Sequence, residues 1–213
     1  MAPDSPNPNS EFPDPAQPVR GVIFDLDGTL VVQELDFEAI RHEIGLPSAT
    51  PLLEALERMG DVELARAQEV LLRHERTAAQ AAVLNPGVRQ FLDWLAERGI
   101  RRGLLSRNSR ESIGLVLDRC GLQFNPIVAR EDAPYKPSPH GIWQICEAWQ
   151  LRPAQVLMVG DYLYDIQAGQ QAGARTVLVT HGRSWPFAGE ADLVLESFER
   201  IPDLLREWID GRI

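Results

Sequence analysis

The sequence predicts an α/β fold: a Rossmann-like parallel sheet with helices on both faces, and a small all-α cap domain inserted after the first strand. Short apolar runs that are typical of buried strands alternate with amphipathic segments of helical length. Such alternation indicates right-handed β-α-β units, which build a parallel sheet covered by helices. Residues 36–85 break the order, because they carry helical stripes of apolar side chains and no convincing strand.

The first residues are rich in proline. Residues 1–18 have almost no apolar periodicity, so we expect a disordered or extended tail there. The ordered core is expected to start near Val19 and to comprise residues 19–35 and 86–213. Strands are expected at residues 20–25, 100–106, 126–129, 156–160, 175–180 and 192–195. Helices that cover the sheet are expected at residues 87–98, 109–120 and 139–150.

The cap domain is expected to comprise residues 36–85. One helical stripe runs through Leu52, Leu56 and Met59, and a second follows it towards Ala82. An Asn-Pro-Gly turn then marks the return to the core. Because the insertion directly follows the first strand, we expect it to lie over the site as a lid.

Composition narrows the class of function. The net charge of −10 argues against broad binding of nucleic acid or of anionic membranes. No apolar run approaches the length of a membrane-spanning helix, and the first residues lack the basic start and apolar core of a signal peptide, so we expect a cytoplasmic location. Cys120 and Cys146 lack metal-ligand spacing and are expected to be reduced core thiols. The oligomeric state stays open.

The stretch Asp25-Leu-Asp27-Gly28-Thr29-Leu30 is the most informative in the chain, and it follows an apolar run typical of a buried strand. Side chains two residues apart on a strand point to the same side, so the two carboxylates are expected to lie together. Unpaired buried charges are costly, which makes packing a poor explanation for them. Paired acids at the end of a strand are instead typical of a site for a hard divalent cation and a phosphate.

Three more candidates lie at or beside the ends of predicted strands. Ser106 follows the second strand, Lys136 lies in a Tyr-Lys-Pro-Ser-Pro segment, and Asp161 and Asp165 follow the fourth strand. Ligands of parallel sheets bind at the carboxyl ends of the strands, so we expect these residues to share one site with Asp25.

In this order, and with the helical insertion in place, the motifs resemble those of the haloacid dehalogenase superfamily of phosphatases. The resemblance is greatest to the phosphoglycolate-phosphatase-like branch, whose members carry a small helical cap after the first motif, and it covers roughly residues 19–205. It implies that Asp25 is the nucleophile and that Asp27 is the general acid and base. It further implies the following matches: Ser106 to the hydroxyl of the second motif, Lys136 to the lysine, and Asp161 and Asp165 to the paired acids.

These implied roles agree with the chemistry of phosphate monoesters, which hydrolyse extremely slowly without a catalyst. Asp25 would accept the phosphoryl group, and Asp27 would protonate the leaving alcohol and then activate water. Neighbouring carboxylates are expected to raise the pKa of Asp27. Mg²⁺ is expected as the cofactor, bound by Asp25, the backbone carbonyl of Asp27 and Asp161, while Asp165 binds a metal water or orients a ligand.

The phosphoryl group is expected to meet several donors. Ser106 would hydrogen-bond one of its oxygens, and Lys136 would neutralise its charge. The backbone N–H groups that follow Asp25, at Gly28 and Thr29, would form a cradle for the same oxygens.

Three residues near these motifs have two readings each. Asn108, followed by Glu111, matches a helix N-cap with its capping-box partner, and the alternative is a phosphate contact. For Arg107 we favour a solvated surface charge over a substrate contact. Arg41, on the first cap helix, is a candidate substrate-binding residue, and the alternative is again a solvated helix charge.

The leading hypothesis is therefore a Mg²⁺-dependent phosphatase acting on a small phosphorylated metabolite, phosphoglycolate-like or a sugar phosphate. A phosphosugar mutase of the same fold would share the motifs at Asp25 and Asp27. A dehalogenase needs no acid two residues after its nucleophile, so Asp27 argues against it. A non-catalytic, receiver-like phosphate-binding module uses similar residues but normally lacks such an insertion. The sequence alone does not choose the substrate.

Overall fold

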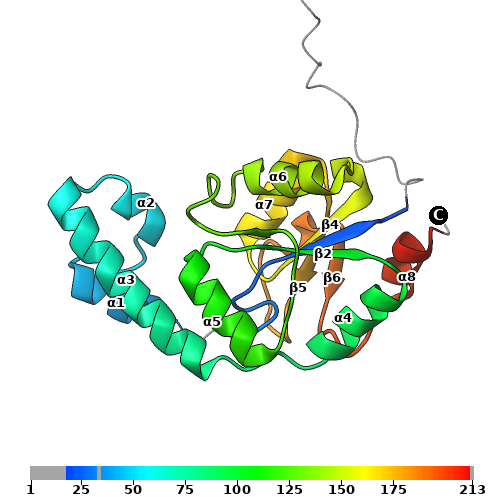
Figure 1. Ribbon diagram of the computed structural model, residues 1–213, viewed down its shortest axis with the longest axis horizontal. Coiled ribbons are helices and arrows are strands. Elements are labelled where there is room, and N and C mark those ends of the chain that lie inside the picture. The colour runs from blue at the N-terminus through cyan, green and yellow to red at the C-terminus, as the bar shows by residue number, and fades with distance from the viewer. Residues whose placement is uncertain (1–17, 33–34, 212–213) are drawn as a thin grey trace, which may run out of the picture.

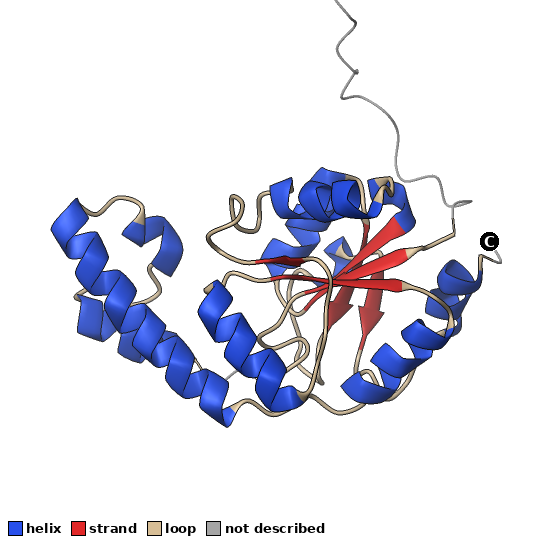
Figure 2. Ribbon diagram, in the orientation of Figure 1, coloured by secondary structure: helices blue, strands red, loops and turns tan. Residues whose placement is uncertain are grey.

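The computed structural model describes residues 18–32 and 35–211, so the expected tail lies almost wholly outside the described residues. Within the described part, six strands form one parallel sheet in the order β3-β2-β1-β4-β5-β6 (Figures 1 and 2). The strands are β1 (Gly21–Phe24), β2 (Arg101–Leu105), β3 (Ile127–Val128), β4 (Val156–Gly160), β5 (Arg175–Val179) and β6 (Leu193–Leu195). Each lies within a segment expected from the sequence, and the predicted α/β fold is confirmed.

Helices cover both faces of the sheet. The covering helices are α4 (Val88–Glu97), α5 (Arg110–Cys120), α6 (His140–Trp149), α7 (Leu163–Ala172) and α8 (Asp203–Asp210), with 3-10 turns η1 (Pro153–Gln155) and η2 (Ala188–Glu190). Val22 and Phe24 of β1 pack with α4, α5 and α8 on one face, whereas Ile23 packs with α6 and α7 on the other. This is the alternation that a strand buried on both sides requires.

The central place of β1 determines where the site forms. Gly21 is in register with Arg101 of β2 on one side and with Val156 of β4 on the other. The pairing continues past the end of β1, because the Asp25 N–H donates to the Val159 carbonyl at 2.9 Å. The residues that follow β1, β2 and β4 therefore meet at one edge of the sheet.

Residues 36–85, the helical insertion, contain α1 (Phe37–Ile44), α2 (Leu52–Leu56) and α3 (Asp61–Ala81). They lie to one side of the sheet, with the end of α3 alongside α5 (Figure 1). Their own small core contains Ile40, Leu52, Leu53, Leu56, Ala67 and Leu71. At its base, the Val32 N–H donates to the Val83 carbonyl at 2.9 Å and the Asn85 N–H to the Leu30 carbonyl at 2.9 Å.

The start of α5 differs from the expected one. Ser109, not Asn108, is the N-cap, and its hydroxyl accepts the Ser112 N–H at 3.2 Å. Glu111 is no capping-box partner, because its carboxylate binds Arg76 of α3 at 2.5 Å. Both residues are good caps by type, and the choice is made by tertiary contacts that occupy the Asn108 side chain.

The structure also bears on two expectations from composition. Cys120 and Cys146 are buried and unpaired, as predicted. In the described part of the chain, no helix is both long and apolar enough to cross a bilayer.

Candidate active site

The loop after β1 is the centre of the candidate site. Asp25 is 8% exposed, and the fully buried Thr29 places its hydroxyl 3.3 Å from one oxygen of that carboxylate. Gly28 turns the loop with a φ of +79°, and a Cβ there would lie only 2.2 Å from Oδ2 of Asp161. Glycine is therefore required at position 28 both by backbone conformation and by the closeness of a carboxylate.

Lys136 joins Asp25, directly after β1, to Asp165 at the start of α7. The Lys136 side chain is 3% exposed, and its Nζ donates to Asp25 Oδ1 at 2.5 Å and to Asp165 Oδ1 at 2.6 Å. Burial alone would lower the pKa of the ammonium, but the charges of Asp165 and Asp25 hold it above its usual value. Lys136 is thus positively charged at the centre of the acidic group.

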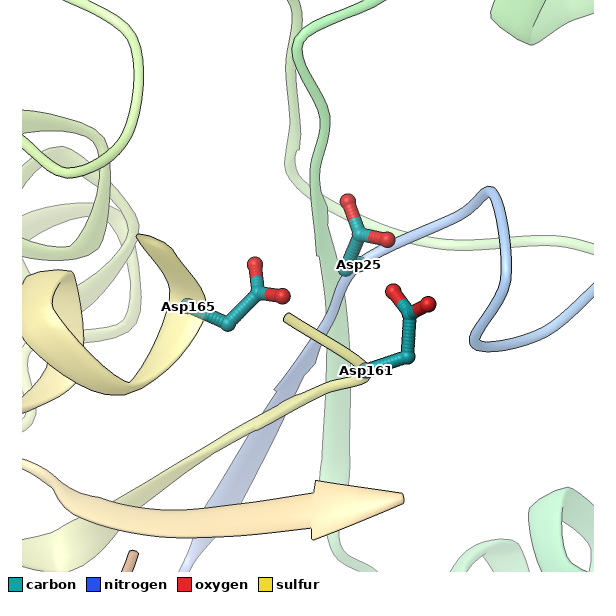
Figure 3. Close-up of side chains that lie close together, drawn as sticks. All are labelled: Asp25, Asp161 and Asp165. Atoms are coloured by element: carbon teal, nitrogen blue, oxygen red, sulfur yellow. The ribbon is translucent and has the colours of Figure 1, made fainter. Parts of the chain in front are cut away.

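Asp161, directly after β4, and Asp165, in the first turn of α7, approach Asp25 (Figure 3). One carboxylate oxygen of each of the three acids lies within 4.8 Å of the others. Asp165 is also tied to its own helix, because its Oδ2 accepts the Tyr162 N–H at 3.1 Å at the start of α7. Its second oxygen is the one that Lys136 binds, so Asp165 is held in place from two sides.

The electrostatics of the three acids suit a cation. Burial, opposed by Lys136, raises the pKa of Asp25 to about 6, and burial together with the charges of Asp25 and Asp165 raises the pKa of Asp161 to about 8. These carboxyl groups therefore lie close together with too little positive charge to balance them. An all-oxygen donor set of this kind fits a hard divalent cation such as Mg²⁺.

Asp27 faces a different partner. Its carboxylate accepts a hydrogen bond from the side-chain amide of Asn108, and it is not among the three acids whose oxygens cluster within 4.8 Å. Burial first, and then the charge of Asp25, raises the pKa of Asp27 to about 7. The expected direction of this shift is confirmed, but burial and not the neighbouring carboxylates is its largest cause. The expected metal contact of the Asp27 backbone carbonyl stays a prediction.

Ser106 directly follows β2 at the same edge of the sheet. It is 3% exposed, and its N–H donates to the Val128 carbonyl at 3.1 Å. Its hydroxyl oxygen accepts the Asn108 N–H at 3.1 Å, which turns the chain so that the Asn108 side chain can reach Asp27. The structure thus gives Ser106 a role in shaping this loop, and its phosphate contact remains a prediction.

The arrangement has known counterparts. The sequence model of the haloacid dehalogenase-like hydrolases matches residues 19–173. The chain belongs to this family.

The hydrolase also has individual relatives. It is 33% identical over 210 residues to a haloacid dehalogenase-like hydrolase domain-containing protein of Arabidopsis thaliana. The matched region covers 90% of this chain and 86% of that protein. It is 30% identical over 190 residues to a phosphoglycolate phosphatase of Pseudomonas putida, and this match covers 76% of this chain and 70% of that protein. A hydrolase structure from Pseudomonas syringae matches with a TM-score of 0.76 at 22% identity, covering 89% of this chain and 99% of that one. That last likeness concerns the fold.

Some residues that hold the site of this haloacid dehalogenase-like hydrolase were missed by the sequence motifs. The Asn85 side-chain amide donates to the Thr29 carbonyl at 2.9 Å, and Nε2 of His181 lies 3.2 Å from the same oxygen. Glu75 of α3 and Arg130 bind the loop that carries Asn108. For Asn85 the sequence offered one signal, the Asn-Pro-Gly turn, but this motif indicated only a turn of the backbone and not a side-chain contact with the Thr29 carbonyl.

The contacts of Arg41 and Arg107 of the hydrolase can be compared with the roles expected for them from the sequence. Arg41 donates to the Thr50 carbonyl at 3.2 Å and to Glu38 at 2.6 Å, so these contacts of the candidate substrate residue lie within the helical insertion. Its substrate contact stays a prediction. The favoured reading of Arg107 as a solvated charge is wrong, because its side chain is 22% exposed and binds Glu54 of α2 at 2.8 Å.

Proposed function

We propose that this protein hydrolyses a small phosphate monoester, with Asp25 as the nucleophile and Asp27 as the general acid and base. The observation that carries the proposal is the pairing of two unlike carboxyl groups at the end of β1. Asp25 is bound to Lys136, whereas Asp27 lies against Asn108 with its pKa raised to about 7. Two neighbouring acids in different environments are typical of sites that divide nucleophilic and proton-transfer work.

The reaction would proceed in two balanced steps. A carboxylate oxygen of Asp25 attacks phosphorus, the bond from phosphorus to the alcohol oxygen breaks, and Asp27 gives its proton to that oxygen. A water oxygen then attacks the phosphorus of the aspartyl-phosphate while Asp27 takes a proton from the water. The bond from phosphorus to Asp25 breaks, which releases inorganic phosphate and restores both acids.

The pKa of Asp27 suits both steps. A group that titrates near 7 is protonated often enough to act as an acid and ionised often enough to act as a base. The Asn108 amide favours the ionised form, while burial and Asp25 favour the protonated form. The environment of Asp27 therefore keeps the two forms closely balanced.

Other groups of the site would bind the phosphoryl oxygens and a metal ion. Lys136 would supply positive charge, and the Ser106 hydroxyl with the Thr29 N–H would donate hydrogen bonds. The N–H of Gly28, also expected to donate to the phosphoryl group, instead donates to the Val31 carbonyl at 2.8 Å. The groups proposed to hold Mg²⁺ are Asp25, Asp161, Asp165 and the backbone carbonyl of Asp27. Mg²⁺ supplies, when bound, charge that screens the anionic substrate from these carboxylates.

The substrate is proposed to be a small phosphorylated metabolite. The family match and a relative named phosphoglycolate phosphatase support this class. The helical insertion, which contacts the core through Arg107 and Glu54, would serve as a lid that excludes water while the phosphoryl group is transferred.

The test is phosphate release from p-nitrophenyl phosphate, phosphoglycolate and sugar phosphates, with Mg²⁺ and with a chelator. We expect Mg²⁺-dependent release that falls by roughly 10³-fold or more in Asp25→Asn. The matched control is Asp118→Asn, which changes an exposed acid on α5 and should retain activity. Isomerisation of a sugar phosphate without net phosphate release would replace the proposal by a mutase, and no turnover at all would reject phosphoryl transfer.

A further inference from the structure

Asn85 lies where the helical insertion returns to the core, and it binds the loop after β1 at three consecutive residues. Its side-chain amide donates to the Thr29 carbonyl at 2.9 Å and to the Gly28 carbonyl at 3.4 Å. Its backbone N–H donates to the Leu30 carbonyl at 2.9 Å. Asn85 is 8% exposed, so these contacts are largely shielded from water. One buried residue therefore fixes the backbone of the loop on both sides of Thr29.

The Thr29 carbonyl is also held by a second element of the core. Nε2 of His181, two residues after β5, lies 3.2 Å from this oxygen. His181 has a φ of +47°, which is uncommon for residues other than glycine, and such a conformation persists only where its surroundings hold it. The return segment of the insertion and the loop after β5 thus converge on one carbonyl group. Two donors from separate elements leave this peptide group little freedom to rotate.

The side chain of Thr29 lies between two of the clustered acids. Its hydroxyl oxygen is 3.3 Å from Asp25 Oδ2 and 3.4 Å from Asp161 Oδ1. The carboxylates of Asp25 and Asp161 lie close together (Figure 3), with oxygens within 4.8 Å of each other, so they repel when both are ionised. The hydroxyl has one proton to share between them and offsets part of this repulsion. The place of Thr29 therefore affects how far apart the two carboxylates lie.

We propose that Asn85 is a positioning residue for the proposed Mg²⁺ site. By holding the Thr29 backbone, it keeps the Thr29 hydroxyl between Asp25 and Asp161 and so keeps their oxygens at the separation that the cation needs. The proposal rests on the proposed phosphatase function, in which both acids are Mg²⁺ ligands. Mg²⁺ tolerates little departure from its preferred ligand geometry, so a small shift of either carboxylate weakens its binding.

The test measures Mg²⁺ binding by calorimetry in the absence of substrate. Asn85→Leu keeps about the same side-chain volume but removes the donor. We expect the Kd for Mg²⁺ to rise by roughly tenfold or more, as is typical when a partner that orients a metal ligand is lost. The matched control is Asn125→Leu, because Asn125 also precedes a proline but is exposed. The Kd of this control should equal that of the wild type.

A double-mutant cycle distinguishes positioning from a general loss of stability. Thr29→Val removes the hydroxyl with little change of shape and should also weaken Mg²⁺ binding. If Asn85 acts through this hydroxyl, Asn85→Leu should weaken Mg²⁺ binding little further in the Thr29→Val protein. The loss of stability that Asn85→Leu causes in urea unfolding should persist there, because the three carbonyl contacts do not depend on the hydroxyl.

Urea unfolding also establishes that each protein is folded before Mg²⁺ is added, and Asn85→Ala, a smaller change that removes the same donor, is used if the leucine protein does not fold. Wild-type affinity for Mg²⁺ in the Asn85 variant, or equal losses with and without the Thr29 hydroxyl, would overturn the positioning role and leave the phosphatase standing. A wild-type protein that binds no Mg²⁺ would overturn the metal site and the positioning role together.

Discussion

Glu75, on α3 of the helical insertion, accepts hydrogen bonds from both the backbone N–H and the hydroxyl of Ser109, at 3.3 Å and 2.7 Å. The Glu75 side chain is 1% exposed, and its other oxygen binds Arg130 at 2.5 Å. Arg130 in turn donates to the backbone carbonyls of Arg107 and Asn108. One buried carboxylate therefore fixes the loop whose Asn108 amide holds Asp27.

Removal of this carboxylate should weaken both the fold and the chemistry. In Glu75→Ala, the partly buried Arg130 and the buried Ser109 would lose their acceptor, which should cost about 1–3 kcal/mol of the free energy of unfolding. The loop that presents Asn108 to Asp27 would also loosen, so kcat should fall. Urea unfolding and phosphate release measure the two effects, with Glu69→Gln, at an exposed position of α3, as a control of unchanged stability. A variant as stable as the wild type would show that the ion pair contributes nothing.

The strands and the first shell of the site could be predicted because their causes are local in sequence. Buried parallel strands are continuous apolar runs, and the residues that follow them, such as Asp25 and Asp161, must meet at one edge of the sheet. The roles of Glu75 and Arg107 could not be predicted in this way. A glutamate on an amphipathic helix or an arginine in a loop normally faces solvent, and only the packing of the insertion on the core buries Glu75 and partly covers Arg107.

The same limit applies to Asn108. Its sequence context fits an N-cap, and Ser109 next to it fits equally well. Two hydrogen bonds determine which of the two residues is the N-cap: the Asn108 amide donates to Asp27, and the Ser109 hydroxyl donates to Glu75. Both partners are remote in sequence.

His181 should make stability depend on pH in a known direction. Burial lowers its pKa from the ordinary value of 6.5, opposed by a hydrogen bond to the Thr29 carbonyl and assisted by the nearby charge of Arg183. The unfolded chain then binds the proton more tightly than the folded one, so stability from this group is lost as the pH falls through about 6.5.

The corresponding measurement is the melting temperature of the wild type and of His181→Asn between pH 7.5 and 5.5. Asparagine tolerates the positive φ of position 181 and does not titrate. The raised pKa values of Asp25, Asp27 and Asp161 act in the opposite direction in both proteins, so the informative quantity is the difference between them. As the pH falls from 7.5 to 5.5, the melting temperature of the wild type should decrease relative to that of the variant. A difference that is constant with pH would contradict the shift.

Gly28 and Gly45 offer a matched pair that separates backbone strain from the geometry of the site. Both have positive φ angles, of +79° and +87°, so alanine at either position should cost roughly 1–2 kcal/mol of stability. At Gly45 an added Cβ meets no atom within 4 Å, whereas at Gly28 it would lie 2.2 Å from Asp161 Oδ2. The Asp161 carboxylate would have to move away from Asp25 and Thr29.

We therefore expect Gly45→Ala to unfold slightly earlier in urea while retaining phosphate release, and Gly28→Ala to lose phosphate release as well as stability. Mg²⁺ should raise the melting temperature of the wild type and of Gly45→Ala more than that of Gly28→Ala, because ligands stabilise only a fold that can bind them. Equal activity and equal response to Mg²⁺ in the two variants would mean that the contact between Gly28 and Asp161 does not shape the site.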